Sequence, residues 1–214
     1  QFVIERIQHA AAVYILAHDP ETIARHATLV EPAPRARTVR VGVNATSKDD
    51  EWEIDIATRD MRGLLARICA TLSDRGFEII NADLATWPDG AVLDSFTVRS
   101  RQKPNAAQIA FELEQRLRKR IENPRRLTRG TKKTFEFTLD NGAHPWHSIV
   151  LVRGVNQPGF IQAVAAAFAR ANINVHHAKI TTEGEEIADS FEVSTRHGRK
   201  ISEQALQRVN TLLS

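Results

Sequence analysis

The sequence of 214 residues has one cysteine, one methionine and one tyrosine, and only 6% of its residues are aromatic. The single cysteine, Cys69, excludes a disulfide framework and a thiolate metal site. Because Cys69 lies within the apolar run LLARICATL, we expect it to be a buried packing residue. The chain lacks the roughly 18 consecutive apolar residues of a membrane span and a recognisable secretory leader. These absences predict a soluble, cytoplasmic chain with no membrane partner.

An excess of charge of either sign is also missing. The 29 basic and 26 acidic residues leave a net charge of +3, and nine of the basic residues fall within 116–133, where Glu122 is the only acid. A solvated helix end and linker is the simplest interpretation of this segment. The alternatives are contact with another part of a longer chain and a nucleic-acid patch. No aromatic residue interleaves the basic ones to stack on bases, so we do not expect a nucleic-acid partner.

With 42% hydrophobic and 26% charged residues, the composition suits two domains of modest size. The chain begins with Gln1 rather than Met, and its first residues already have helical apolar spacing, which predicts a fragment of a longer protein. Asp19 and Pro20 are the N-cap and first residue of an expected helix that Pro32 ends. We assign residues 1–34 to a helical lead-in or linker without a core of its own.

After this lead-in, one series of expected elements occurs twice. Each series contains a strand hairpin, a helix, two strands and a final helix. Laying Gly63 on Gly159 aligns the two copies, and after one deletion the tripeptide DSF at 94–96 meets DSF at 189–191. A repeat of about 95 residues is too long for a solenoid unit and suits a duplicated domain.

The repeat predicts an α+β fold. We expect two tandem ferredoxin-like βαββαβ domains, each with an extra leading strand, over residues 35–123 and 124–214. Helices on one face of each sheet would leave the other face or an edge to pair with the sister copy or with another chain. Pairing of domains is therefore expected, and a homodimer is one form that it could take.

Two stretches of the sequence resemble the ACT domain, the small ligand-binding module of amino-acid metabolism. They run over 58–98 and 153–194, and each contains Asp/Asn-x-x-Gly-hydrophobic and, further on, Thr followed by Asp-x-Phe. Between these motifs the second stretch has Asn-Ile and Asn-Val, where the first has Glu78-Ile79. The arrangement is similar to the C-terminal end of the bifunctional uridylyltransferase/uridylyl-removing enzymes that modify PII proteins. The family forms DG-x-x-LD-x-F-x-V and T-x-GE-x-x-x-D-x-F-x-V appear here as DGAVLDSFTV and TEGEEIADSFEV.

This resemblance implies a regulatory region that senses glutamine and switches catalytic domains elsewhere in a longer chain. The expected partners are a free amino acid, with glutamine first, those catalytic domains and, indirectly, PII. The sequence departs from the family at Met61-Arg62, where Arg-Pro is usual, and at Asn156-Gln157, where Asp-Arg is common. It has no nucleotidyltransferase signature or HD metal site, and we interpret His18-Asp19 as part of a helix start. We expect no catalytic residue, metal or cofactor.

The expected ligand site is the helix start at Gly159. A first turn without a blocking side chain leaves backbone N–H groups open to an anion such as an amino-acid carboxylate. Asn174 begins the next strand and can both donate and accept, and the resemblance implies an amide at this position and at Asn156. The predicted ligand-binding residues are Asn156, Gln157, Pro158, Gly159, Phe160 and Asn174, with Asp60, Arg62 and Gly63 beside Glu78 as a second or degenerate site.

Several alternatives remain open at this point. The same residues could simply cap helices, and the region could be a structural pairing module with vestigial pockets. Two histidine pairs lack a third ligand of suitable spacing, so we do not expect them to hold a metal. Two strand carboxyls are interpreted as turn-facing structural acids rather than general bases. The histidine pairs are His144 with His147 and His176 with His177, and the carboxyls are those of Asp94 and Asp189.

Overall fold

The computed structural model describes residues 19–87, 89–119, 127–129, 132–133, 135–155, 157, 159–180, 182–183 and 186–214, without the side chains of 128–129, 132–133 and 182–183. After one leading helix, the first copy has four strands and two helices. Its elements are α3 (Pro20–Val30), β1 (Arg40–Ala45), β2 (Glu51–Arg59), α4 (Leu64–Asp74), β3 (Glu78–Thr86), β4 (Ala91–Arg99) and α5 (Ala106–Leu117).

The second copy repeats this series and adds three short strands. A two-stranded ribbon precedes it, and β10 lies between its third and fourth main strands. The elements are β5 (Thr128–Arg129), β6 (Lys132–Lys133), β7 (Phe135–Asp140), β8 (Ser148–Val155), α6 (Phe160–Arg170), β9 (Ile173–Lys179), β10 (Thr182–Glu183), β11 (Glu186–Thr195) and α7 (Glu203–Leu213).

Side-chain caps begin three of the helices, and glycines begin the other two. Asp19, Asn105 and Ser202 accept a backbone N–H of the first turn of α3, α5 and α7, which satisfies a donor that the helix leaves unpaired. Gly63 and Gly159 precede α4 and α6 with φ of 70° and 76°, in the left-handed region, and among the described residues no side chain caps either helix. The first helix after the hairpin of each copy, α4 and α6, is thus the one without a side-chain cap.

Each copy forms an antiparallel sheet in which the leading strand occupies an edge. The first sheet has the order β1-β2-β4-β3, and the second has β7-β8-β11-β9 with β10 beside β11. Within the described residues, no strand joins the sheet after the last helix of a copy. The observed series is therefore ββαββα, and the extra leading strand lies where the closing strand of βαββαβ was expected.

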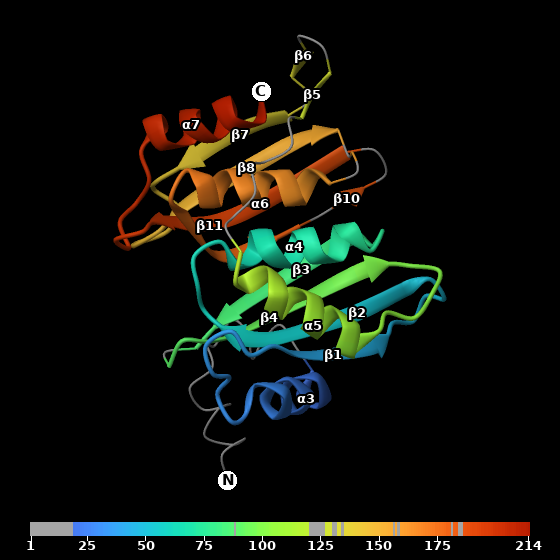
Figure 1. Cartoon of the computed structure of the whole chain (residues 1–214). Coiled ribbons are helices and arrows are strands. Elements are labelled where there is room, and N and C mark those ends of the chain that lie inside the picture. Colours follow the sequence, from blue (N-terminus) through green and yellow to red (C-terminus); the bar gives the residue numbers. More distant parts are fainter. Residues whose placement is uncertain are drawn as a thin grey trace.

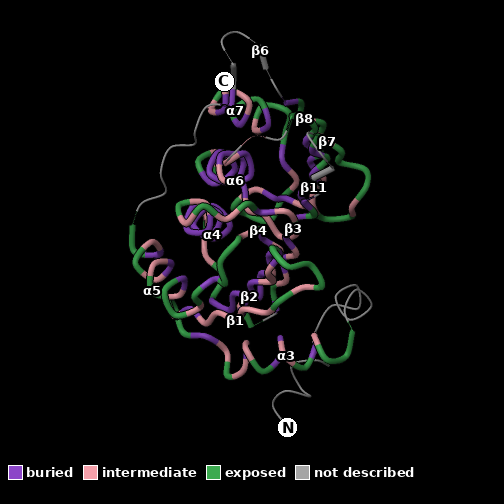
Figure 2. The backbone as a smooth tube through the Cα atoms, turned by 90° about the vertical axis from the view of Figure 1, so that its right-hand side faces the viewer, coloured by how far each residue is buried: buried purple, intermediate pink, exposed green. Residues whose placement is uncertain are grey.

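The two copies pack side by side. Figures 1 and 2 show α7, α6, α4 and α5 in one row along the same side of both sheets. At the junction α4 contacts α6, and β3 contacts β9. His177 on β9 lies 3.4 Å from the carbonyl oxygen of Leu84 and 3.5 Å from the carboxylate of Asp83, both on β3. The expected pairing of domains therefore occurs within the chain.

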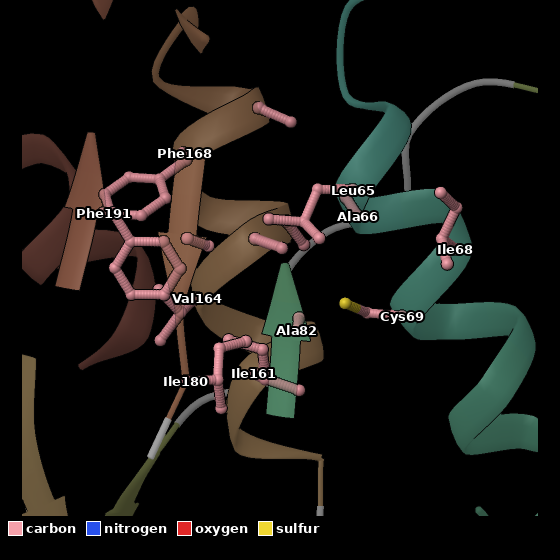
Figure 3. Close-up of a cluster of buried hydrophobic side chains, with 14 of the residues drawn as sticks. Leu65, Ala66, Ile68, Cys69, Ala82, Ile161, Val164, Phe168, Ile180 and Phe191 are labelled. Atoms are coloured by element: carbon pink, nitrogen blue, oxygen red, sulfur yellow. The ribbon is translucent and has the colours of Figure 1, made fainter. Parts of the chain in front are cut away.

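Apolar side chains fill the junction between α4 and α6. Figure 3 shows Leu65 and Ala66 of α4 turned toward α6, which contributes Ile161, Val164 and Phe168. All five are buried, with at most 8% of each residue exposed. One hydrophobic core therefore runs through both copies, and the copies cannot separate without exposing it to water. Cys69 lies in this core as a buried free thiol, as expected.

The leading helix α3 packs on the other face of the first sheet, away from α4 and α5. Its contacts include a buried polar pair. The ring of His26 is fully buried, and its Nε2 lies 3.1 Å from Oδ1 of Asp55 on β2. Asp55 also accepts hydrogen bonds from Ser95, Asn44 and Arg25. Burial alone would raise the pKa of Asp55, but these bonds and the charges of His26 and Arg25 hold it below its usual value.

Candidate functional site

A cavity of about 220 Å³, here called cavity A, lies between the two copies. One wall is the loop that leads into α4, and the opposite wall is the turn after α6 with the start of β9. Side chains from β3 and β4 close its base. Its polar and charged lining residues are Asp60, Arg62, Thr86, Asp94, Asn174, His176 and Arg196.

The start of α4 lines cavity A. Gly63, Leu64, Leu65 and Ala66 all line the cavity, and no side chain caps this helix. The Leu64 N–H bonds to the carbonyl of Met61, which tightens the turn before the helix. An uncapped helix start carries a partial positive charge and unpaired donors, so it suits an anion such as a carboxylate.

Arg67 holds this loop from behind. It is 8% exposed, and its guanidinium donates to the carbonyls of Arg62 and Gly63 at 3.1 and 3.3 Å. It also donates to the carbonyls of Arg116 and Lys119 at the end of α5. No acidic partner is found for Arg67 within the described part of the chain, so a buried positive charge lies behind the helix start that faces cavity A.

The second copy supplies an amide to cavity A. Asn174 is the second residue of β9, where it pairs with Ser194 of β11, and it is half-buried. Just before it, Asn172 has φ of 59°, a left-handed conformation that asparagine tolerates. Its side-chain oxygen accepts a hydrogen bond of 2.8 Å from Arg62 of the first copy. The two walls of cavity A are therefore joined by a direct bond.

Asp94 lies at the base of cavity A, in the middle of β4, and is 3% exposed. Burial raises the pKa of Asp94 well above its usual value, and the nearby charges of Asp60 and Asp83 raise it further. Cavity A therefore combines an anion-binding helix start, an amide and a buried carboxyl group.

A second cavity of about 430 Å³, cavity B, occupies the matching place across the repeat. Here the loop into α6 faces the start of β3. Gln157, Gly159 and Phe160 line one wall, Glu78 lines the other, and Asp189 on β11 takes the place of Asp94. Glu78 carries an ion pair with Arg99 at 3.0 Å. Cavity B thus has the same architecture as cavity A, with a carboxylate where cavity A has the amide of Asn174.

Comparison with known proteins identifies the fold family. Residues 148–213 match the family model described as ACT domain, and the first copy has the same order of main strands and helices. Residues 148–213 form an ACT domain, and the two copies together are here called the ACT pair. Within the described residues, the pair has no helix that combines the length and the apolar character needed to cross a membrane.

Two curated relatives of the ACT pair carry the name bifunctional uridylyltransferase/uridylyl-removing enzyme. The protein from Rhodospirillum rubrum is 30% identical over 90% of this chain, and that from Aromatoleum aromaticum is 31% identical over 93%. The chain spans only 22% and 25% of their lengths. A solved aspartate kinase from Synechocystis has 18% identity and a TM-score of 0.43, over 77% of this chain and 26% of that one.

The ACT pair groups the predicted residues crosswise. Asn174 was expected beside Gly159 but lies in cavity A, with Asp60, Arg62 and Gly63. Gly159, with Gln157 and Phe160, instead faces Glu78 in cavity B. The reason is the contact of β3 with β9, which turns the strand after each uncapped helix toward the loop of the other copy. Asn156 and Pro158 lie outside the described residues.

Sequence reasoning missed three buried charged residues of this site. Asp94 and Asp189 were expected to be turn-facing structural acids, but they line cavities A and B. Their burial could have been found from the alternation of β4, where Val92 and Phe96 share the face of Asp94. Arg67 lies within the apolar run of α4, and no sequence signal separates it from a solvent-facing arginine.

Three histidines and a glutamate meet on the second ACT sheet. The ring of His147 stacks on those of His144 and His176, with centroids 5.0 and 4.1 Å apart. Glu192 contacts His147 and lies 3.6 Å from Nε2 of His144, so it is the third group that spacing along the sequence did not reveal. Because Nδ1 of His144 accepts two backbone N–H groups, its neutral ring carries the proton on the nitrogen that faces Glu192. A hydrogen-bonded cluster accounts for this geometry.

The basic segment 116–133 is only partly described. Arg116 pairs with Asp74 at the end of α4, and Arg118 and Lys119 are exposed. Most of the other basic side chains lie outside the described residues. The described part is therefore a charged helix end that contacts its neighbouring helix, as in the simplest interpretation of the sequence.

Proposed function

We propose that this ACT pair binds a free amino acid in cavity A and regulates the catalytic domains of a longer uridylyltransferase/uridylyl-removing enzyme. Glutamine is the leading ligand, because the sequence resemblance implies it. The catalytic domains would be the direct partners, and PII would be an indirect one. The observation that carries the proposal is that one cavity unites the uncapped start of α4 with Asn174 of the other copy.

The chemistry of cavity A suits an amino acid. The N–H groups of the α4 start would bind the ligand carboxylate, to which such a helix start contributes about 0.3–1 kcal/mol when exposed and more when partly buried. Asn174 offers a donor and an acceptor to a side-chain amide such as that of glutamine. The volume of about 220 Å³ lies below the roughly 300–1,000 Å³ of sites for drug-sized ligands, which favours a small metabolite.

Regulation would follow from the position of the ligand between the copies. A ligand shifts a conformational equilibrium only by the difference in its affinity for the two states. An amino acid in cavity A would contact both walls, so it would favour the closed junction over any arrangement in which β9 and α4 move apart. Cavity B is a second candidate site on the same architecture, with Gln157, Gly159 and Phe160 facing Glu78.

Thermal unfolding with a panel of amino acids tests the proposal. A ligand present at a hundredfold excess over its dissociation constant stabilises the native state by about 2.7 kcal/mol. We expect glutamine to raise the midpoint, and other amino acids to do so less. If no amino acid shifts the midpoint, the alternative of a pairing module with vestigial pockets is favoured, and the large apolar junction of α4 and α6 already supports a pairing role.

A further inference from the structure

Asp94 and Asp55 are buried carboxyl groups on neighbouring strands with opposite surroundings. Asp55 receives hydrogen bonds from His26, Ser95, Asn44 and Arg25. Asp94 is 3% exposed and lines cavity A, yet no donor within the described part of the chain lies at hydrogen-bond distance from its carboxyl oxygens. A buried carboxylate without donors is costly. The carboxyl group of Asp94 therefore lies where a molecule in cavity A can supply the hydrogen-bond donors that it lacks.

The start of α4 and Asp94 together have the polarity of an amino acid. A zwitterion needs donors for its carboxylate and an acceptor for its ammonium group, and cavity A has the first at the α4 start and the second at its base. We propose that Asp94 receives the ammonium group of the amino acid in cavity A, and that binding releases a proton from Asp94. This inference rests on the proposed function and adds the group that would select ligands with a free amine.

The proton balance follows from the surroundings of Asp94. In the empty cavity its raised pKa favours the neutral carboxylic acid. When the ammonium group arrives, its charge and N–H donors favour the carboxylate, so the O–H bond of Asp94 breaks and the proton leaves to solvent, while the ligand keeps its own three ammonium protons. Affinity should therefore rise with pH until the pH exceeds the pKa of Asp94 in the empty cavity, and then level off.

Other titratable groups near Asp94 act on the same balance. Asp60 and Asp83 add negative charge, and the buried thiol of Cys69 stays neutral because burial raises its pKa. His176 lines the same cavity, and burial together with His147 lowers its pKa, so it is mostly neutral at physiological pH. Two exposed arginines, Arg62 and Arg196, complete the charged groups around the cavity.

The test is calorimetric titration of the 214-residue chain with glutamine, in two buffers that differ in heat of ionisation and at several pH values. We expect the wild type to release up to one proton per glutamine, and to release less as the pH rises. Asp94→Asn should abolish this proton release. It should also lower the affinity for glutamine at least tenfold, as expected for the loss of a hydrogen bond to a charged group. Asp49→Asn, the same change in the exposed turn between β1 and β2, should retain both proton release and affinity within about threefold.

A second probe keeps the test independent of the folding of a variant. Glutaramate is glutamine without its amino group, and the wild type should bind it at least tenfold more weakly than glutamine, whereas Asp94→Asn should hardly distinguish the two. Glutamine binding by the wild type without proton release, and with no preference over glutaramate, would overturn the role of Asp94 and leave the proposed function standing. Failure of the wild type to bind any amino acid would overturn both.

Discussion

Arg62 of the first ACT domain donates a hydrogen bond of 2.8 Å to the side-chain oxygen of Asn172 in the second. The bond links the two copies beside cavity A, because Arg62 precedes α4 and Asn172 follows α6. Both side chains are exposed, so the bond contributes little to stability, but it fixes the distance between the two walls. A ligand in cavity A would therefore meet both domains at once.

Asn174→Ala should weaken glutamine binding without unfolding the chain. Its amide is half-buried, so its loss removes one or two ligand hydrogen bonds at about 0.5–1.5 kcal/mol each. We expect affinity to fall by roughly twofold to 150-fold, with the melting midpoint of the free protein almost unchanged. Titration calorimetry measures the first quantity and circular dichroism the second. Glu78→Ala, at the matched position in cavity B, is the control, and an equal loss of affinity there would contradict the choice of cavity A.

Gly63→Ala and Gly159→Ala form a matched pair. Both glycines have positive φ, and a residue with a Cβ pays about 1–2 kcal/mol in that conformation. The space around Gly159 is open, since its nearest neighbour is Oε1 of Gln162 at 3.7 Å, so the cost there comes from the backbone. Each variant should lower the melting midpoint by a few degrees. Only Gly63→Ala should lower the affinity for the ligand of cavity A. An equal loss of affinity in both variants would argue for binding in both cavities.

The element order and the repeat could be predicted from the sequence because they depend on local signals. Asp19 and Pro20 mark the start of α3, and the glycines at 63 and 159 mark the uncapped helices. These signals depend on a few neighbouring residues. The glycine signal also occurs at the matching position of both copies, which strengthens the prediction. Asn105 likewise marks the start of α5, which ends at Leu117 together with its buried stripe.

The composition of the candidate site could be predicted only in part, because it depends on how the copies dock. Asn174 was expected near the loop before α6 of its own copy, but it lines cavity A with the loop before α4 of the other copy. One sequence does not say which edge strands meet. The partners of buried charges are hidden for the same reason, since His26 and Asp55 are 29 residues apart.

Arg67→Met should loosen the loop that forms the α4 start. The substitution keeps the apolar stem and removes the donors to four carbonyl groups. Because unsatisfied buried carbonyls are costly, we expect a loss of about 1–3 kcal/mol in the free energy of unfolding, together with weaker glutamine binding. Urea unfolding and calorimetry measure the two effects. Arg67→Lys keeps the charge but offers fewer donors, and should lie between the wild type and Arg67→Met. Unchanged affinity in Arg67→Met would show that the loop holds its shape alone.

Acid should release α3 from the first sheet. The pKa of Asp55 is lower in the folded protein than its usual value, so at pH values between the two the unfolded state binds more protons. The stabilisation is therefore complete above the ordinary pKa of an aspartate and is lost as the pH falls through the folded value. Amide hydrogen exchange of α3, followed from neutral to acid pH, should show protection falling in this window before that of α4 and α6.

Asp55→Asn separates this mechanism from general acid unfolding. The variant removes the charge beside the fully buried His26 and should cost roughly 3 kcal/mol, as for a buried pair that loses one partner. It should also flatten the pH dependence of α3 protection, because no carboxylate remains there to be protonated. Ser95→Ala removes one donor to Asp55 and should cost only about 1 kcal/mol, with the pH dependence retained and shifted upward. If α3 in Asp55→Asn still loses protection over the same acid range, another carboxylate, such as Glu53 beside Arg25, must control the docking of α3.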